Sequence, residues 1–260
     1  MSSPSHPFAS PLVHPTPAPT SALIFLHGRG DSSRNFLPLF TTTPISTPPH
    51  TLGGILSPKT RIVVPTCLPT HSPIYGTRYA VWFDMFHERG AWNGDYTAHQ
   101  KHSIRACVSY LHSVIETEIA SGIPASQIWV GGISQGMGAA MLTFLCGRWK
   151  LGGVVGLSGW VPFAADLVVE ALSFIAPDLI PQDTSEDEKK QLDAAIDNVL
   201  ATPVFLGHGT ADRTLRYQIG RSVYTLFRVL GVKVEWRRYE GLGHWWRAPE
   251  EVDDMVEFMV

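Results

Sequence analysis

Cysteine is scarce in this sequence. The chain of 260 residues contains three, Cys67, Cys107 and Cys146, and long stretches separate them. An odd, widely spaced set excludes the disulfide framework of small secreted domains and is typical of proteins kept in a reducing compartment. We therefore predict a cytoplasmic location.

Long apolar runs and blocks of one charge are also missing. No stretch reaches the ~18 apolar residues of a membrane-spanning helix, so we expect no stable membrane insertion. The first twenty residues lack the basic and apolar regions of a secretion signal. The net charge is −3 and no basic stripe occurs, which argues against a nucleic-acid partner.

Motifs for cofactors and metals are missing as well. The sequence has no glycine-rich phosphate loop of the Walker or dinucleotide type, and it has no His-Glu-x-x-His zinc motif. We expect that the protein uses no cofactor and no metal ion.

The sequence does contain alternating strand-like and helix-like segments. Short apolar runs flanked by Gly, Pro or polar residues are typical of parallel strands buried on both faces. Segments with apolar residues at three- to four-residue spacing lie between them. This order predicts an α/β fold with a mostly parallel central sheet and helices on both faces. The expected strands are 22–26, 61–64, 128–130, 154–157, 204–206 and, nearer an edge, 232–237; the expected helices cover 104–115, 136–145, 217–230 and 249–260.

Two segments fall outside this alternation. Residues 1–20 are rich in Pro and Ser and predict an extended or partly disordered arm, so that 21–260 form the domain. Residues 162–202 predict a helical insertion before the strand at 204. A capping box at 185–188 begins its second helix, which is expected to bury one apolar face, Leu192, Ala195, Ile196 and Val199. The insertion is either a crossover on the surface or a cap over the active site.

The stretch Gly132-Ile133-Ser134-Gln135-Gly136 predicts a sharp strand-to-helix turn that exposes a serine hydroxyl. A serine on such a turn has a strained backbone, and small neighbours avoid clashes around it. An apolar strand precedes the pentapeptide and a run of helix formers follows it. We predict that Ser134 is a nucleophile.

A serine nucleophile needs a base, and the base needs a carboxylate to orient it. Asp212 follows the strand at 204–206, and His244 follows the last expected strand. Both therefore belong at the carboxyl edge of a parallel sheet, where ligands bind. His208 is the other histidine in reach, but it stands too close to the strand end and is expected to be structural.

Tetrahedral intermediates of acyl transfer require preorganised N–H donors. One donor is expected from the backbone of Gln135, directly after the nucleophile. The other is expected from the backbone of Arg29, in the glycine-rich stretch that ends the strand at 22–26. These two amides form the predicted oxyanion hole.

Six motifs occur in order along the chain: HGRGDS, VWFDM, GGISQGMGAA, LSGW, HGTAD and GLGH. Through these motifs the chain resembles the phospholipase/carboxylesterase family of α/β-hydrolases, which includes the acyl-protein thioesterases. The resemblance runs from about residue 22 to the end. It implies an α/β-hydrolase fold, the triad of Ser134, Asp212 and His244, and hydrolysis of carboxylic esters or thioesters. It also implies that Trp82, Phe83 and Trp160 lie near the acyl-binding side, although for Phe83 core packing is favoured.

Three departures bear on the substrate. Arg29 replaces an apolar residue of the family pattern, Trp245 and Trp246 follow His244 where a small residue is usual, and the segment 162–202 is longer. We therefore predict a serine esterase for short to medium acyl chains, with Trp82, Trp160 and Trp245 contacting the substrate.

Two other functions remain alternatives: a long-chain acyl-protein thioesterase or lysophospholipase, and a non-catalytic binding protein on the same scaffold. The expected partner is a small-molecule ester or acyl thioester. A homodimer formed through exposed aromatic residues is left open.

Overall fold

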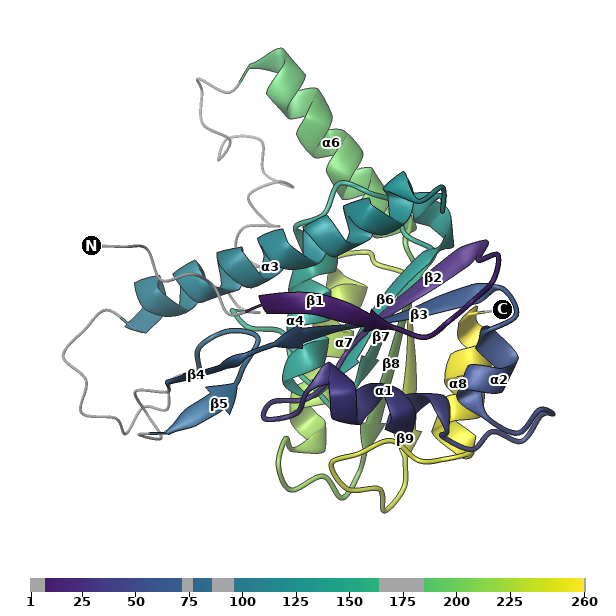
Figure 1. Ribbon diagram of the computed structural model, residues 1–260. Helices are drawn as coiled ribbons and strands as arrows, with labels where there is room; N and C mark the ends of the chain where they lie inside the picture. The colour runs from purple at the N-terminus through teal and green to yellow at the C-terminus, as the bar shows by residue number, and fades with distance from the viewer. Residues whose placement is uncertain (1–7, 72–76, 86–95, 164–184, 260) are drawn as a thin grey trace.

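A single sheet of seven strands organises the molecule (Figure 1). The computed structural model describes residues 8–71, 77–85, 96–163 and 185–259. The strand order is β1-β3-β2-β6-β7-β8-β9, and every neighbouring pair is parallel except β1 with β3. The predicted α/β fold is confirmed. The strands are β1 (Phe8–Val13), β2 (Ser21–Leu26), β3 (Thr60–Cys67), β6 (Ile128–Ile133), β7 (Gly153–Leu157), β8 (Val204–Gly209) and β9 (Val234–Tyr239).

Helices cover both faces of the sheet because successive strand residues point to opposite sides. In β2, Ile24 and Leu26 belong to one hydrophobic core, whereas Leu23 and Phe25 belong to the other. The first core is completed by α3 (Tyr96–Ala120), α4 (Gln135–Leu145) and α7 (Tyr217–Val229), and the second by α1 (Ser33–Thr41), α2 (Leu52–Leu56) and α8 (Glu250–Met259) (Figure 1).

The strand β1 lies inside the segment that the sequence indicates as an arm. It pairs with β3 at the sheet edge, with a register shift between Ala9 and Leu12 that adjoins Pro11. A proline and a bulge are tolerated there because the outer side of an edge strand needs no ladder hydrogen bonds. The formation of β1 therefore depends on hydrogen bonds to β3 rather than on an alternating apolar pattern in its own sequence.

Several short elements have no counterpart among the predictions. The helix α1 contains Pro38, which normally argues against a helix interior, and the side chain of its N-cap Ser32 accepts a hydrogen bond from the Asn35 backbone. A small hairpin, β4 (Pro69–His71) with β5 (Arg78–Ala80), and a 3₁₀ turn, η1 (Ala125–Gln127), complete the described elements. These segments are too short for periodicity to identify them.

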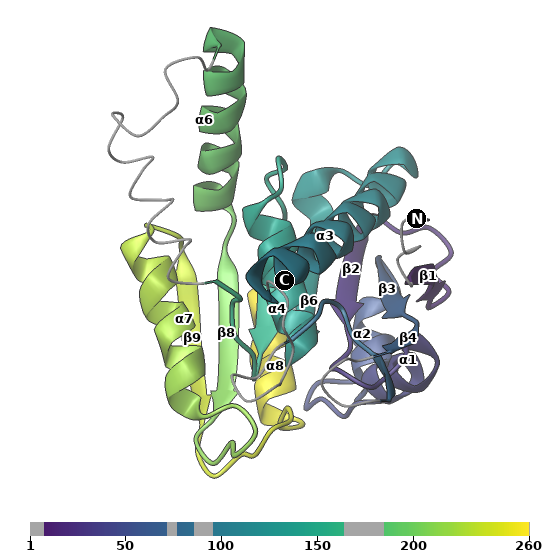
Figure 2. The same cartoon turned by 90° about the vertical axis from the view of Figure 1, so that its left-hand side faces the viewer.

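The described part of the predicted insertion is α6 (Glu186–Ala201), and residues 164–184 lie outside the described residues. Figures 1 and 2 show α6 standing out from the body of the molecule. The apolar face predicted to be buried is only partly buried, which corrects that expectation. The helix ends just before β8 begins, so it joins the amino edge of the sheet.

A buried carboxyl group lies where α8 packs against β8. Glu251 has no solvent exposure, its Oε2 accepts a hydrogen bond from the Arg247 backbone at 2.9 Å, and its Oε1 contacts Gly207. Among the described residues, Oε1 has no hydrogen-bond partner. Burial raises the pKa of Glu251 from 4.5 to about 8, because the low-dielectric surroundings disfavour the charged form.

We predict that this group makes the protein less stable at alkaline pH. The folded state binds the proton more tightly than the unfolded state, so the free energy of unfolding falls as pH rises from about 4.5 to about 8. Glu251→Gln removes the titration. The variant is expected to match wild type near pH 5 and to exceed it at pH 9 by an amount on the order of 4 kcal/mol.

Urea unfolding at both pH values measures the difference. Glu250→Gln is the matched control, because the neighbouring Glu250 side chain is exposed and only pairs with Arg247 at the surface. A gain at pH 9 that is equal in both variants would contradict the prediction.

Candidate active site

Ser134 lies at the turn between β6 and α4, with φ of 57° and ψ of −123°. A non-glycine residue at positive φ is strained, and the surroundings must hold it there. A Cβ atom at Gly132 would collide with the Gly136 backbone, and one at Gly136 would collide with the Leu26 and His27 carbonyls. The two glycines are therefore required by close backbone approach.

The structure brings the three residues of the predicted triad together at the carboxyl edge of the sheet. Ser134 follows β6, Asp212 follows β8 and His244 follows β9. The Ser134 Oγ lies 2.9 Å from His244 Nε2, and His244 Nδ1 lies 2.7 Å from Asp212 Oδ2. A hydroxyl, an imidazole and a carboxylate in one hydrogen-bonded chain can activate the serine for attack on an acyl carbon.

The Asp212 carboxylate is held rigidly and away from water. Its Oδ1 accepts hydrogen bonds from the backbones of Thr214 and Leu215, at 2.8 and 2.9 Å. These two bonds leave Oδ2 facing His244. The loop after β8 thus fixes which oxygen receives the imidazole N–H.

His208 lies beside Asp212 and approaches the carboxylate oxygen that also meets His244. Its Nε2 lies 2.9 Å from the Leu215 carbonyl and 3.3 Å from Asp212 Oδ2. Burial lowers the pKa of His208, so the ring is neutral and shares its Nε2–H between these two acceptors. His208 therefore supports the acid and has no contact with Ser134, in agreement with the structural part expected for it.

The loop after β2 and the start of α4 both lie beside the nucleophile. A Cβ atom at Gly28 would lie 3.7 Å from that of Ser134, so the Arg29 backbone is close to the serine. Gln135 is the first residue of α4, where backbone N–H groups have no partner inside the helix. The loop that carries Arg29 and the start of α4 therefore both lie next to Ser134.

The three tryptophans predicted to contact substrate have different surroundings. Trp82 is 1% exposed, and its indole N–H donates to the His27 carbonyl at 2.8 Å, so it offers no open surface to an acyl chain. Trp160 is partly buried, with its ring edge-on to Phe83, which is itself buried as expected. Trp245 is 41% exposed and stacks on the buried Trp246 at 4.2 Å.

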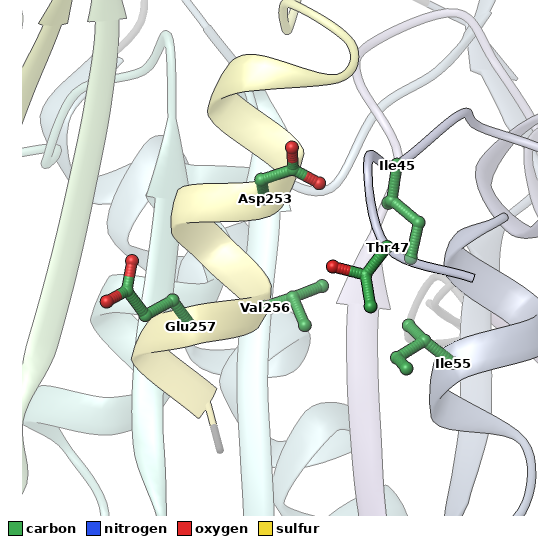
Figure 3. A pocket seen from close by; sticks show the side chains of 6 residues that line it. All are labelled: Ile45, Thr47, Ile55, Asp253, Val256 and Glu257. Carbon is green, nitrogen blue, oxygen red and sulfur yellow. The ribbon is translucent and has the colours of Figure 1, made fainter. Parts of the chain in front are cut away.

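A cavity of about 580 Å³ lies away from the triad, between α8 and the loop that leads into α2 (Figure 3). Figure 3 shows Ile45, Ile55 and Val256 with Thr47 between them, and acidic side chains on α8. No residue that lines this cavity belongs to the triad or to the predicted oxyanion loops. It is a separate feature from the site built around Ser134.

A family model described as phospholipase/carboxylesterase matches residues 10–174, which is more than half of the chain. The chain belongs to this family. The match covers the first predicted oxyanion loop and the nucleophile turn, and it ends before the strands that carry Asp212 and His244.

Curated relatives cover most of the chain. The chain is 30% identical over 261 residues to an acyl-protein thioesterase 1 of Cryptococcus neoformans, with 95% of this chain and 94% of the relative covered. It is 27% identical over 226 residues to a probable carboxylesterase, SOBER1-like, of Arabidopsis thaliana, with 85% and 71% covered.

Solved structures share the same fold. The acyl-protein thioesterase 2 of Zea mays superposes with a TM-score of 0.67 at 22% identity, covering 96% of this chain and 99% of the other. SOBER1 of Arabidopsis thaliana superposes with a TM-score of 0.66 at 23% identity, covering 92% and 97%. At these identities the likeness supports the fold alone.

Among the helices that the structure describes, none combines the length and apolar character needed to cross a bilayer.

Proposed function

We propose that the protein is a serine hydrolase that cleaves carboxylic esters through Ser134, His244 and Asp212. Membership of the phospholipase/carboxylesterase family makes the chain a hydrolase of ester bonds. The observation that carries the assignment of residues is the chain of hydrogen bonds from Ser134 Oγ through the His244 ring to Asp212.

The reaction has two halves. His244 Nε2 takes the proton of Ser134 as Oγ attacks the acyl carbonyl, and Asp212 stabilises the imidazolium that forms. His244 then gives this proton to the leaving alcohol or thiol, which leaves an ester between Ser134 and the acyl group. Water repeats the sequence on the acyl-enzyme, with His244 as its base, and frees the carboxylic acid.

The negative oxygen of each tetrahedral intermediate is held by the backbone N–H groups of Arg29 and Gln135. These donors act because they are already in place when charge develops on the oxygen. The start of α4 adds the positive end of a helix dipole at the same point.

The acyl chain that fits this site is short to medium in length. Trp245 follows His244 directly, and its ring stacks on Trp246 at 4.2 Å. Trp246 is in turn packed edge-on against Phe36 and Phe40, at 5.7 and 6.1 Å. Because the stacked rings of Trp245 and Trp246 are anchored in the core, they cannot easily move aside, and they limit the space beside the triad.

Hydrolysis of long-chain acyl thioesters is the second candidate. It is favoured by the names of several curated relatives, including those of Cryptococcus neoformans and Yarrowia lipolytica, which are acyl-protein thioesterases. The two candidates differ in acyl length and leaving group and share the same triad.

A paired rate series separates them. We expect kcat/KM for matched oxyesters and thioesters to peak at short acyl chains and to fall about 10- to 100-fold by palmitoyl, which corresponds to a total misfit cost on the order of 1–3 kcal/mol. Trp245→Ala is expected to restore about 10-fold of the loss for long chains, and Trp245→Phe, which keeps an aromatic wall, to restore little.

If the wild-type kcat/KM for long-chain thioesters matches or exceeds that for short-chain oxyesters, the short-chain proposal is overturned in favour of the second candidate. Equal chain-length profiles in wild type and Trp245→Ala would remove Trp245 from the account of specificity.

A further inference from the structure

The side chain of Gln135 does more than fill space after the nucleophile. It is completely buried, and both ends of its carboxamide are used. Its Oε1 accepts a hydrogen bond from the Trp82 backbone at 3.1 Å, and its Nε2 donates to the Phe83 carbonyl at 2.8 Å. One side chain at the start of α4 therefore clamps two successive backbone groups of a distant segment.

The clamped segment is tied to the loop after β2 by two further bonds. The Trp82 indole N–H donates to the His27 carbonyl at 2.8 Å, and the Gly30 backbone N–H donates to the Ala80 carbonyl at 2.8 Å. His27 and Gly30 stand on either side of Gly28 and Arg29. The hydrogen bonds thus run from Gln135, through the segment that holds Trp82, to the residues around Arg29.

We propose that the Gln135 carboxamide and the Trp82 indole are positioning groups that hold the two donors of the oxyanion hole in register. The inference rests on the proposed function, in which the Arg29 and Gln135 backbones supply those donors. The two loops are far apart in the sequence, so the chain itself does not fix the distance between them. The segment around Trp82 bridges them.

The geometry explains why buried polar groups, the Gln135 carboxamide and the Trp82 indole, are used at this position. An oxyanion needs both donors about 2.7–3.1 Å from the position that it will occupy, and small displacements cost large factors in rate. Apolar packing is non-directional, whereas a hydrogen bond with both partners buried sets distance and direction. A clamp of three buried bonds suits a requirement of this kind.

Two variants test the inference. Gln135→Met removes both bonds of the carboxamide with little change of volume, and Trp82→Phe removes the indole N–H together with part of the buried ring. Thr143→Val is the matched control, because Thr143 is buried in the same helix and its Oγ1 makes one hydrogen bond, to Ala139. Thermal unfolding is followed for all of them.

The readout compares an ester with its thionoester, in which sulfur replaces the carbonyl oxygen. Sulfur is larger and accepts hydrogen bonds weakly, so an aligned oxyanion hole favours the ester strongly. We expect Gln135→Met to lower kcat/KM for the ester about 10- to 100-fold and Trp82→Phe about 10-fold, with much smaller losses for the thionoester. The preference for the ester therefore falls, and Thr143→Val keeps it within about 2-fold of wild type.

The outcomes distinguish the inference from the function on which it rests. Wild type that neither hydrolyses esters nor reacts with a fluorophosphonate contradicts the proposed function. Wild type that does both, with variants that lose stability but keep the preference for the ester, overturns only the positioning role. Should Gln135→Met not fold, Trp82→Phe decides the question alone.

Discussion

Ser134→Ala is expected to lower kcat for ester hydrolysis by about 10⁶-fold, the largest effect of any single change in this protein. Without the hydroxyl no acyl-enzyme forms, and His244 has no proton to take. The remaining rate comes from direct attack of water on the acyl carbonyl, with the oxyanion donors and substrate binding still leaving about 10³- to 10⁴-fold catalysis over the uncatalysed reaction.

Ser158→Ala is the control for this change. Ser158 is also buried, also follows a strand of the sheet and also has a positive φ, of 45°. Its Oγ has no hydrogen-bond partner among the described residues. The same chemical change at Ser158 should alter kcat by no more than a few-fold, so a comparable loss in both variants would point to misfolding instead.

Covalent labelling completes the test of Ser134. A fluorophosphonate should add its phosphonyl mass to wild type and to Ser158→Ala, and peptide mapping should find it on Ser134. No mass gain in wild type would contradict the serine hydrolase assignment and would support a non-catalytic binding protein on this scaffold.

Asp212→Asn is expected to lower kcat by about 10⁴-fold although the shape of the side chain is kept. The backbone N–H groups of Thr214 and Leu215 donate to Oδ1, so they select the amide oxygen of an asparagine for that position. The amide NH₂ is then turned toward His244. His244 must accept with Nδ1 and carry its proton on Nε2, where it cannot take the proton of Ser134.

The kcat of this variant is measured with the same short oxyester, beside Asp253→Asn as control. Asp253 also accepts a backbone hydrogen bond, from Ser46 at 2.9 Å, but it lies on α8 outside the site. The control should keep wild-type kcat. If Asp212→Asn retains more than about a tenth of the wild-type rate, Asp212 is not the group that orients the base.

The sequence predicted the architecture and the meeting of Ser134, Asp212 and His244 because both depend on local signals and on chain order. Strands buried on both faces appear in the sequence as short apolar runs, and the helices between them appear as apolar residues repeated every three to four positions. The nucleophile turn is visible in five residues because backbone crowding at Gly132 and Gly136 admits no side chain. Chain order along a parallel sheet then brings residues after β6, β8 and β9 to one edge.

Trp82 illustrates what that reading misses. Its motif indicated a substrate contact, whereas the structure buries it and engages its N–H with the His27 carbonyl. An aromatic residue has the same signature in a sequence whether it lines a pocket or braces a loop. Only its neighbours from other segments distinguish the two.

The apolar face of α6 and the strand β1 differ from expectation for a related reason. A period of apolar residues shows that a helix has a face to bury, but it does not show what the helix meets, and α6 stands out from the body (Figure 2). The strand β1 has Pro11 and little alternation, yet β3 provides its hydrogen bonds.

By itself, the sequence determined the alternation of the central strands and helices, the strained turn at Ser134 and the places of Asp212 and His244 after β8 and β9. Those features follow from backbone sterics and from periodicity, which act between residues close together in the chain. The tertiary structure alone decided that His208 supports Asp212 and that Gln135 and Trp82 join the two loops beside Ser134. Each of these depends on hydrogen bonds between distant segments, and such bonds exist only once packing has excluded water and set the distances.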